Sequence, residues 1–118
     1  MEGASKYDLE ERTFKFAKEV RNFINQLPRT IQSIEDAKQL VRSSGSVGAN
    51  YIEANESLGK KDFGMRIKIS QKEAKESRFW LQLLEVKNED LAIKREQLAR
   101  EATELIMIFT SILKKVKV

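Results

Sequence analysis

The segment 33–58, SIEDAKQLVRSSGSVGANYIEANESL, constrains the fold of this chain more than any other. When its residues are placed at about 100° per residue, the small and apolar side chains fall on one arc and the polar side chains on the opposite arc. The apolar arc comprises Ile34, Ala37, Leu40, Val41, Ser44, Val47, Gly48, Tyr51 and Leu58. This pattern predicts an amphipathic helix with a wide buried face.

Three other segments repeat apolar residues at steps of three and four, and they predict helices over about 8–27, 62–87 and 89–116. Pro28 follows the first helix, Gly59 is expected to end the second, and Asp62 and Asn88 are expected to cap the third and fourth. A chain of 118 residues suffices for one core. The sequence therefore predicts a single all-α domain over 1–118, an antiparallel up-down four-helix bundle.

The composition removes most catalytic and metal chemistry. The chain has no His and no Cys, so the commonest general base, the thiolate nucleophile and the usual zinc ligands are absent. Ser57-Leu58-Gly59-Lys60 matches S-x-x-K only in letters, because this serine stands where a helix is expected to end. We therefore expect no enzyme, no cofactor and no metal site.

The location of the protein is inferred from its apolar runs. The longest, Leu105 to Phe109, is far shorter than the roughly 20 residues that a membrane span needs, and the first residues lack an apolar signal core. We expect a cytoplasmic protein without a membrane partner.

Basic residues concentrate near the start of the third predicted helix: Lys60, Lys61, Arg66, Lys68, Lys72, Lys75 and Arg78. Such a cluster predicts salt-sensitive binding to the backbone of RNA or DNA. The alternative is an ordinary surface on which Glu73 and Glu76 balance the lysines.

A polar stripe follows the second predicted helix: Arg42, Ser46, Asn50 and Glu53. One interpretation is a face exposed to water. The other is a hydrogen-bonded seam against another protomer or against the third helix, whose Glu73, Glu76 and Arg78 are suitable partners.

Several apolar residues lie outside the core stripes: Phe14, Met65, Ile69, Trp80, Ile93, Met107 and Ile108. An exposed apolar surface of this extent usually marks an interface. Because the chain encodes no other partner, we expect it to form a homo-oligomer through these residues.

The segment Ser46-Val47-Gly48-Ala49-Asn50-Tyr51-Ile52-Glu53 resembles the S-[IV]-[PG]-A-N-x-x-E signature of the four-helix-bundle proteins encoded by intervening sequences in bacterial 23S ribosomal RNA genes. Lys61-Asp62-Phe63 and the segment from Lys72 to Leu81 are similar to the third helix of that family. One departure is Ala54-Asn55, where many members have Gly directly after the Glu. An unbroken second helix to Leu58 is therefore expected.

The resemblance implies a left-handed up-down bundle, a ring-shaped homopentamer and no catalytic residues. It also implies kinship with the accessory proteins of diversity-generating retroelements, which bind nucleic acid and a reverse transcriptase. The leading hypothesis is a non-enzymatic oligomer that binds RNA or DNA through basic faces. The alternative is a structural scaffold for protein interactions that binds no nucleic acid.

Overall fold

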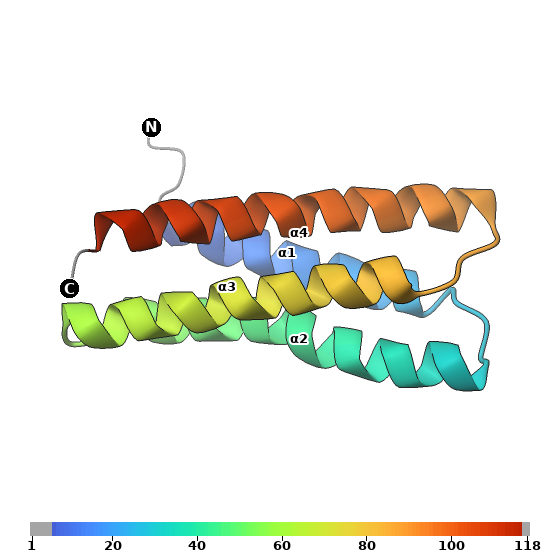
Figure 1. The fold of residues 1–118 in the computed structure, drawn as a ribbon, viewed down its shortest axis with the longest axis horizontal. Helices are drawn as coiled ribbons and strands as arrows, with labels where there is room; N and C mark the ends of the chain where they lie inside the picture. The colour runs from blue at the N-terminus through green and yellow to red at the C-terminus, as the bar shows by residue number, and fades with distance from the viewer. Residues whose placement is uncertain (1–5, 117–118) are drawn as a thin grey trace.

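The computed structural model describes residues 6–116 and contains four helices (Figure 1). They are α1 (Lys6–Ile24), α2 (Ile31–Asn55), α3 (Lys60–Leu83) and α4 (Glu89–Lys115). Each helix packs against its neighbours in sequence, and α1 also contacts α4, which closes the bundle. This arrangement confirms the predicted all-α, antiparallel up-down four-helix bundle.

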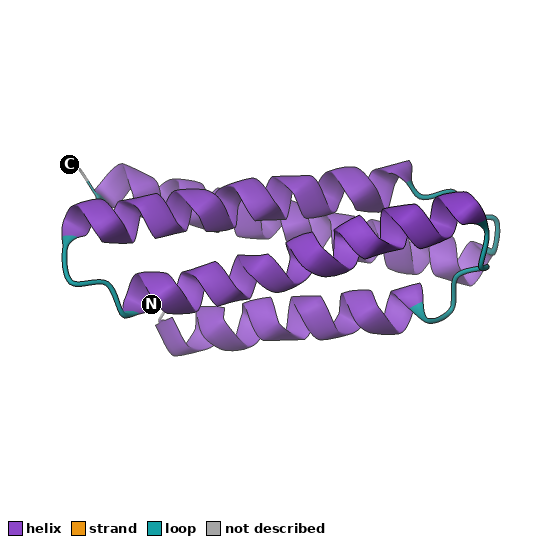
Figure 2. Cartoon of the chain, turned by 90° about the horizontal axis from the view of Figure 1, so that it is seen from below, coloured by secondary structure: helices purple, strands orange, loops and turns teal. Residues whose placement is uncertain are grey.

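Short connections at the two ends of the bundle reverse the chain between successive helices (Figure 2). Since every helix is antiparallel to the next one, α1 and α2 form one side of the bundle and α3 and α4 form the opposite side. Of these elements, α3 lies between α2 and α4, so one arc of its surface faces outward.

The core consists of the apolar arcs that the sequence predicts. Its large, fully buried members include Phe16, Phe23, Leu40, Val47, Ile67, Leu81, Leu105 and Phe109. They recur at three- and four-residue steps or sums of these steps along each helix, which places them on one face. Burial of each large side chain contributes roughly 1.5–3 kcal/mol to the stability of the bundle.

Serines allow α2 and α3 to approach closely. The Ser70 hydroxyl donates to the Val47 carbonyl at 2.9 Å, and the Ser77 hydroxyl donates to the Ser43 hydroxyl at 3.0 Å. All three serines are buried, so their hydroxyls need these partners. Small polar groups thus replace large apolar ones along this helix pair.

The two glycines inside α2 have different roles. A Cβ added at Gly48 would lie 2.8 Å from the Thr13 Oγ1 atom of α1, whereas one added at Gly45 would meet only the Arg21 side chain, at 3.4 Å. Gly48 therefore admits the close approach of α1. At Gly45 the helix is not crowded.

An arginine joins α1 to α4. Arg12 donates from Nε to Glu101 Oε2 at 2.6 Å and from Nη2 to Glu101 Oε1 at 2.9 Å, and it also contacts Glu104. The hydrogen bonds to Glu101, followed by its charge and that of Glu104, raise the pKa of Arg12 despite partial burial. This bidentate pair fixes the register of the two helices.

The predicted end of the second helix is wrong. α2 stops at Asn55, and Leu58, expected in the buried arc, is fully exposed. Gly59 is not a C-terminal glycine: its φ of −148° is extended, and it occupies the N-cap position of α3. Residues 56–59 form the reversal between α2 and α3, and none of their side chains is buried.

Other helix limits also differ from the prediction: α1 ends at Ile24, not 27, and α3 begins at Lys60, so Asp62 lies in its first turn and is not its cap. α2 begins at Ile31 because the Thr30 side chain accepts a hydrogen bond from the Ser33 backbone N–H. α3 ends at Leu83, not 87, because Leu84 leaves the helical conformation and stays buried at the end of the core. The predicted cap Asn88 is confirmed, since its side chain accepts from the Leu91 backbone N–H at 3.0 Å.

Candidate nucleic-acid interface

Positive charge in this protein is concentrated on α3. The helix carries seven basic and three acidic residues, an excess of four that equals the excess of the whole chain. The basic residues are the seven that the sequence predicts as a nucleic-acid surface. The structure separates them into two groups according to the direction of their side chains.

The two arginines turn sideways toward neighbouring helices. Arg66 donates from Nη1 to Asn50 Oδ1 of α2 at 3.3 Å. Arg78 donates from Nη1 to Thr103 Oγ1 of α4 at 3.1 Å. Both side chains are half-buried, so they connect helices and are not presented on the outward surface.

The five lysines, in contrast, are all exposed. Four of them fall within an arc of about 60° on α3 at 100° per residue. We call this set the lysine row: Lys61, Lys68, Lys72 and Lys75. The row points away from the core, and Gln71, which borders it on one side, donates to Thr110 of α4 at 2.8 Å.

The lysine row has no counterion within the described part of the chain. No described carboxylate lies within 4.0 Å of any of its ammonium groups. Glu73 and Glu76, the residues expected to balance it, instead contact Arg42 of α2 at 3.3 and 2.6 Å. The positive charge of the row therefore faces solvent without local neutralisation.

The polar stripe of α2 lies along the border with α3. Arg42 pairs with α3 carboxylates, and Asn50 accepts from Arg66 while donating to the Ser46 carbonyl at 2.9 Å. Ser46 is half-buried, and Glu53 is exposed. Two members of the stripe thus contact the third helix of the same subunit.

One carboxylate in this seam is buried. Glu73 retains 7% of its exposure, and its Oε1 atom accepts no hydrogen bond in the described structure although Arg42 lies nearby. A buried carboxylate with one partner depends strongly on that partner. Arg42 therefore stabilises the fold while it holds Glu73 and Glu76 away from the lysine row.

The residues predicted to form an oligomer interface do not make one patch. Four of them have 55–66% of their surface exposed: Phe14, Met65, Ile93 and Met107. The half-buried ones are Ile69, Trp80 and Ile108, of which the last two pack against the core of their own subunit. Large apolar side chains outside the predicted set are also exposed: Ile31, Ile52, Leu58, Phe79 and Leu83.

Sequence reasoning did not select Phe79 as a site residue. Its ring is 55% exposed and lies on the same arc of α3 as the lysine row, since it follows Lys75 by four residues and Lys72 by seven. The signal was available in that spacing. Phe79 directly precedes Trp80 and Leu81 in the sequence, so it is easily grouped with the core stripe.

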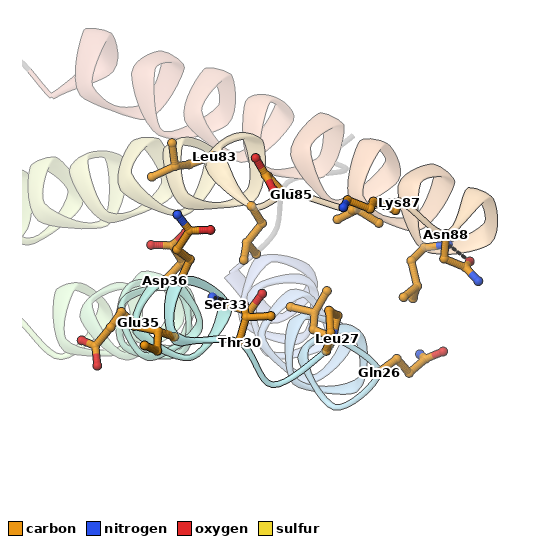
Figure 3. Close-up of a pocket in the computed structure, with 16 residues that line it drawn as sticks. Gln26, Leu27, Thr30, Ser33, Glu35, Asp36, Leu83, Glu85, Lys87 and Asn88 are labelled. Carbon is orange, nitrogen blue, oxygen red and sulfur yellow. Dashed lines mark hydrogen bonds between the residues drawn. The ribbon is translucent and has the colours of Figure 1, made fainter.

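A separate pocket of about 970 Å³ opens at one end of the bundle (Figure 3). It lies between the first turns of α2, which diverge from α3 in Figure 1, and the connection from α3 to α4. Its walls include Leu27, Leu84 and Val86, with Asp36 and Glu85 among the polar lining. These groups show no arrangement of acid, base and nucleophile.

The described residues contain no group of three or more His, Cys, Asp or Glu placed to hold a metal ion. No helix among them has the length and apolar character needed to cross a membrane.

Comparisons with known proteins agree with this fold. The chain is similar to a crystal structure from the S23 ribosomal protein family of Bacteroides thetaiotaomicron VPI-5482, a protein with unknown function. The two are 28% identical with a TM-score of 0.77, over 92% of this chain and 97% of the other. A search of curated proteins finds no match. The family model for 23S rRNA-intervening sequence proteins matches residues 5–111, and the chain belongs to that family.

Proposed function

We propose that this protein is a non-enzymatic, self-assembling bundle that binds RNA or DNA through the outward face of α3. The observation that carries the proposal is the lysine row, whose four exposed ammonium groups lack a described carboxylate partner. Phosphate groups would supply the missing negative charge and release counterions on binding. The family is named for 23S rRNA, which makes structured RNA the first probe.

Adjacent residues of α4 extend this positive surface. Lys114 lies one turn beyond Thr110, which contacts α3, and it is exposed. Self-assembly would place several copies of the row on one particle, and linked weak sites bind far more tightly than one. A modest charge on each subunit therefore suffices for binding.

Two separate sets of exposed apolar side chains support self-assembly. Phe14 and Ile52 are exposed on the α1–α2 side, and Ile93 and Met107 are exposed on α4. Contact between two different patches is heterologous and can close into a ring. The homopentamer that the family resemblance implies would be such a ring, so we propose a cyclic homo-oligomer.

The test uses a variant in which the lysine row is neutralised by Gln, designated the α3 variant. A control variant neutralises four exposed or partly paired lysines elsewhere: Lys15, Lys18, Lys38 and Lys87. Both variants lose the same net charge. In gel-shift titrations with structured RNA, we expect the α3 variant to bind about tenfold or more weakly than the control.

Equal binding by the two variants would refute the α3 face as the binding surface. A second candidate function is a protein-interaction scaffold, which the exposed apolar side chains of α1 and α4 favour. If the wild-type protein assembles but binds neither RNA nor DNA at low salt, the scaffold is the correct function.

A further inference from the structure

We infer that the α3 face binds single-stranded nucleic acid, with the backbone along the lysine row and one base stacked on the Phe79 ring. This inference rests on the proposed function and adds to it the class of ligand and a residue that recognises it. The argument depends on the exposure of Phe79, its support by Trp80 and its position relative to the lysines.

Phe79 is an exposed ring on a rigid support. It retains 55% of its exposure, and it contacts Trp80 edge to face, with ring centroids 5.0 Å apart and planes at 80°. Trp80 is itself half-buried and packs against the core. A ring held in this way loses little freedom when a base stacks on its open face.

The ring continues the lysine row. Phe79 lies within about 40° of Lys68, Lys72 and Lys75 around the helix axis. A helix rises about 1.5 Å per residue, so these lysines precede the ring by roughly 16, 10 and 6 Å along α3. A strand whose phosphates follow the row would bring a base to Phe79.

This combination selects a single strand over a duplex. In a duplex the base faces are stacked on one another, and only phosphates and groove edges are available to a flat helical surface. In a single strand each base offers a face, and proteins that bind single strands combine a cationic track with aromatic platforms. The lysines would serve either ligand, but Phe79 serves only the single strand.

The chain offers a matched control in Phe14, which is 66% exposed. Phe79 is exposed on the outward arc of α3 that carries the lysine row. Phe14 lies on α1, which has no direct packing contact with α3 among the described residues. Replacing either residue by Ala removes an exposed aromatic ring, but only one ring adjoins the lysine row.

The experiment measures fluorescence anisotropy of a labelled 16-nucleotide single-stranded RNA and of the corresponding 16-base-pair duplex. The variants are Phe79→Ala, Phe79→Tyr and Phe14→Ala, with circular dichroism and light scattering to check that fold and assembly are unchanged. We expect Phe79→Ala to weaken binding of the single strand by about 5- to 150-fold, the range for loss of one stacked base. Its duplex binding should change less than twofold.

Phe79→Tyr keeps a stacking ring and should bind like the wild type, as should Phe14→Ala. Unchanged single-strand binding by Phe79→Ala, or an equal loss for both ligands, would overturn the inference. If that result accompanies weak binding by the α3 variant, only the stacking role fails and the proposed function stands. If the wild-type protein binds neither the single strand nor the duplex, whether RNA or the corresponding DNA, both proposals fail.

Discussion

The Arg42 guanidinium of α2 lies 2.6 Å from the Glu76 carboxylate of α3, across the border between the two helices. The same guanidinium contacts Glu73 at 3.3 Å. These contacts draw Glu73 and Glu76 to the α2 side of α3, whereas the lysine row points away from the core. Arg42 of α2 thus contributes to the separation of negative and positive charge around α3.

Replacing Arg42 should therefore reduce stability. Arg42→Met leaves Glu73 buried without its cationic partner, so we expect the free energy of unfolding to fall by about 2 kcal/mol in urea denaturation. Adding Glu73→Gln should restore about half or more of this loss, because the buried group then carries no charge. Additive effects of the two substitutions would contradict the proposed dependence of Glu73 on Arg42.

The two glycines of α2 should respond to Ala in opposite directions. Gly48→Ala places a methyl group 2.8 Å from Thr13 Oγ1, and overpacking of this kind costs about 1–3 kcal/mol. This overpacking cost exceeds the gain of about 1 kcal/mol in helix propensity, so the melting temperature should fall.

Gly45→Ala meets only the end of the Arg21 side chain, at 3.4 Å, so it should gain most of that propensity and melt at a higher temperature. Thermal unfolding followed by circular dichroism measures both variants. If Gly48→Ala proved as stabilising as Gly45→Ala, the close contact with Thr13 would not exist in solution.

Because the pKa of Tyr51 is raised in the folded protein, we expect the protein to lose stability at high pH. Burial raises the pKa of Tyr51 above its usual 10.0, the nearby Glu10 carboxylate raises it further, and Asn55 acts in the opposite direction. Above about pH 10 the unfolded chain releases this proton while the folded chain retains it, so stability falls as the pH rises.

Tyr51→Phe removes this contribution. The difference in unfolding free energy between wild type and variant should therefore change as the pH rises from 9 to 11, with the wild type losing more. Urea denaturation at each pH provides the measurement. Parallel pH profiles for the two proteins would show that Tyr51 ionises equally well in the folded state.

Self-assembly predicts that the exposed apolar side chains of α1 and those of α4 are both needed for the oligomer. Phe14→Asp and Met107→Asp each place a carboxylate on an exposed position, so neither should unfold the subunit. Each should disrupt a heterologous contact and give a monomer in size-exclusion chromatography with light scattering. A wild-type protein that is monomeric at micromolar concentration would contradict self-assembly.

The fold could be predicted from the sequence because apolar periodicity is a local property. The spacing of Phe16, Val20 and Phe23, or of Leu98, Leu105 and Phe109, places each set on one face without knowledge of its neighbours. Helix ends depended on tertiary packing when no strong local signal was present. α3 ends where Leu84 folds over the core, and neither Pro nor Gly marks that point.

The candidate site could be predicted only in part. The helical period identifies Lys68, Lys72 and Lys75 as outward residues, but it does not reveal that Arg42 of another helix binds Glu73 and Glu76. Ion pairs between helices depend on register, which one sequence does not supply. The proposed role of Phe79 depends on its exposure and on its contact with Trp80, which the helical period does not reveal.

The most direct test of the central claim is the salt dependence of binding to single-stranded RNA, measured by anisotropy from 50 to 300 mM salt. Each phosphate contact contributes about 0.7 to the slope of log affinity against log salt for a single strand. Neutralising the four residues of the lysine row should reduce the magnitude of the slope by roughly 3 per bound subunit, whereas the control variant should match the wild type. Equal slopes for all three proteins would contradict the assignment of the α3 face as the nucleic-acid interface.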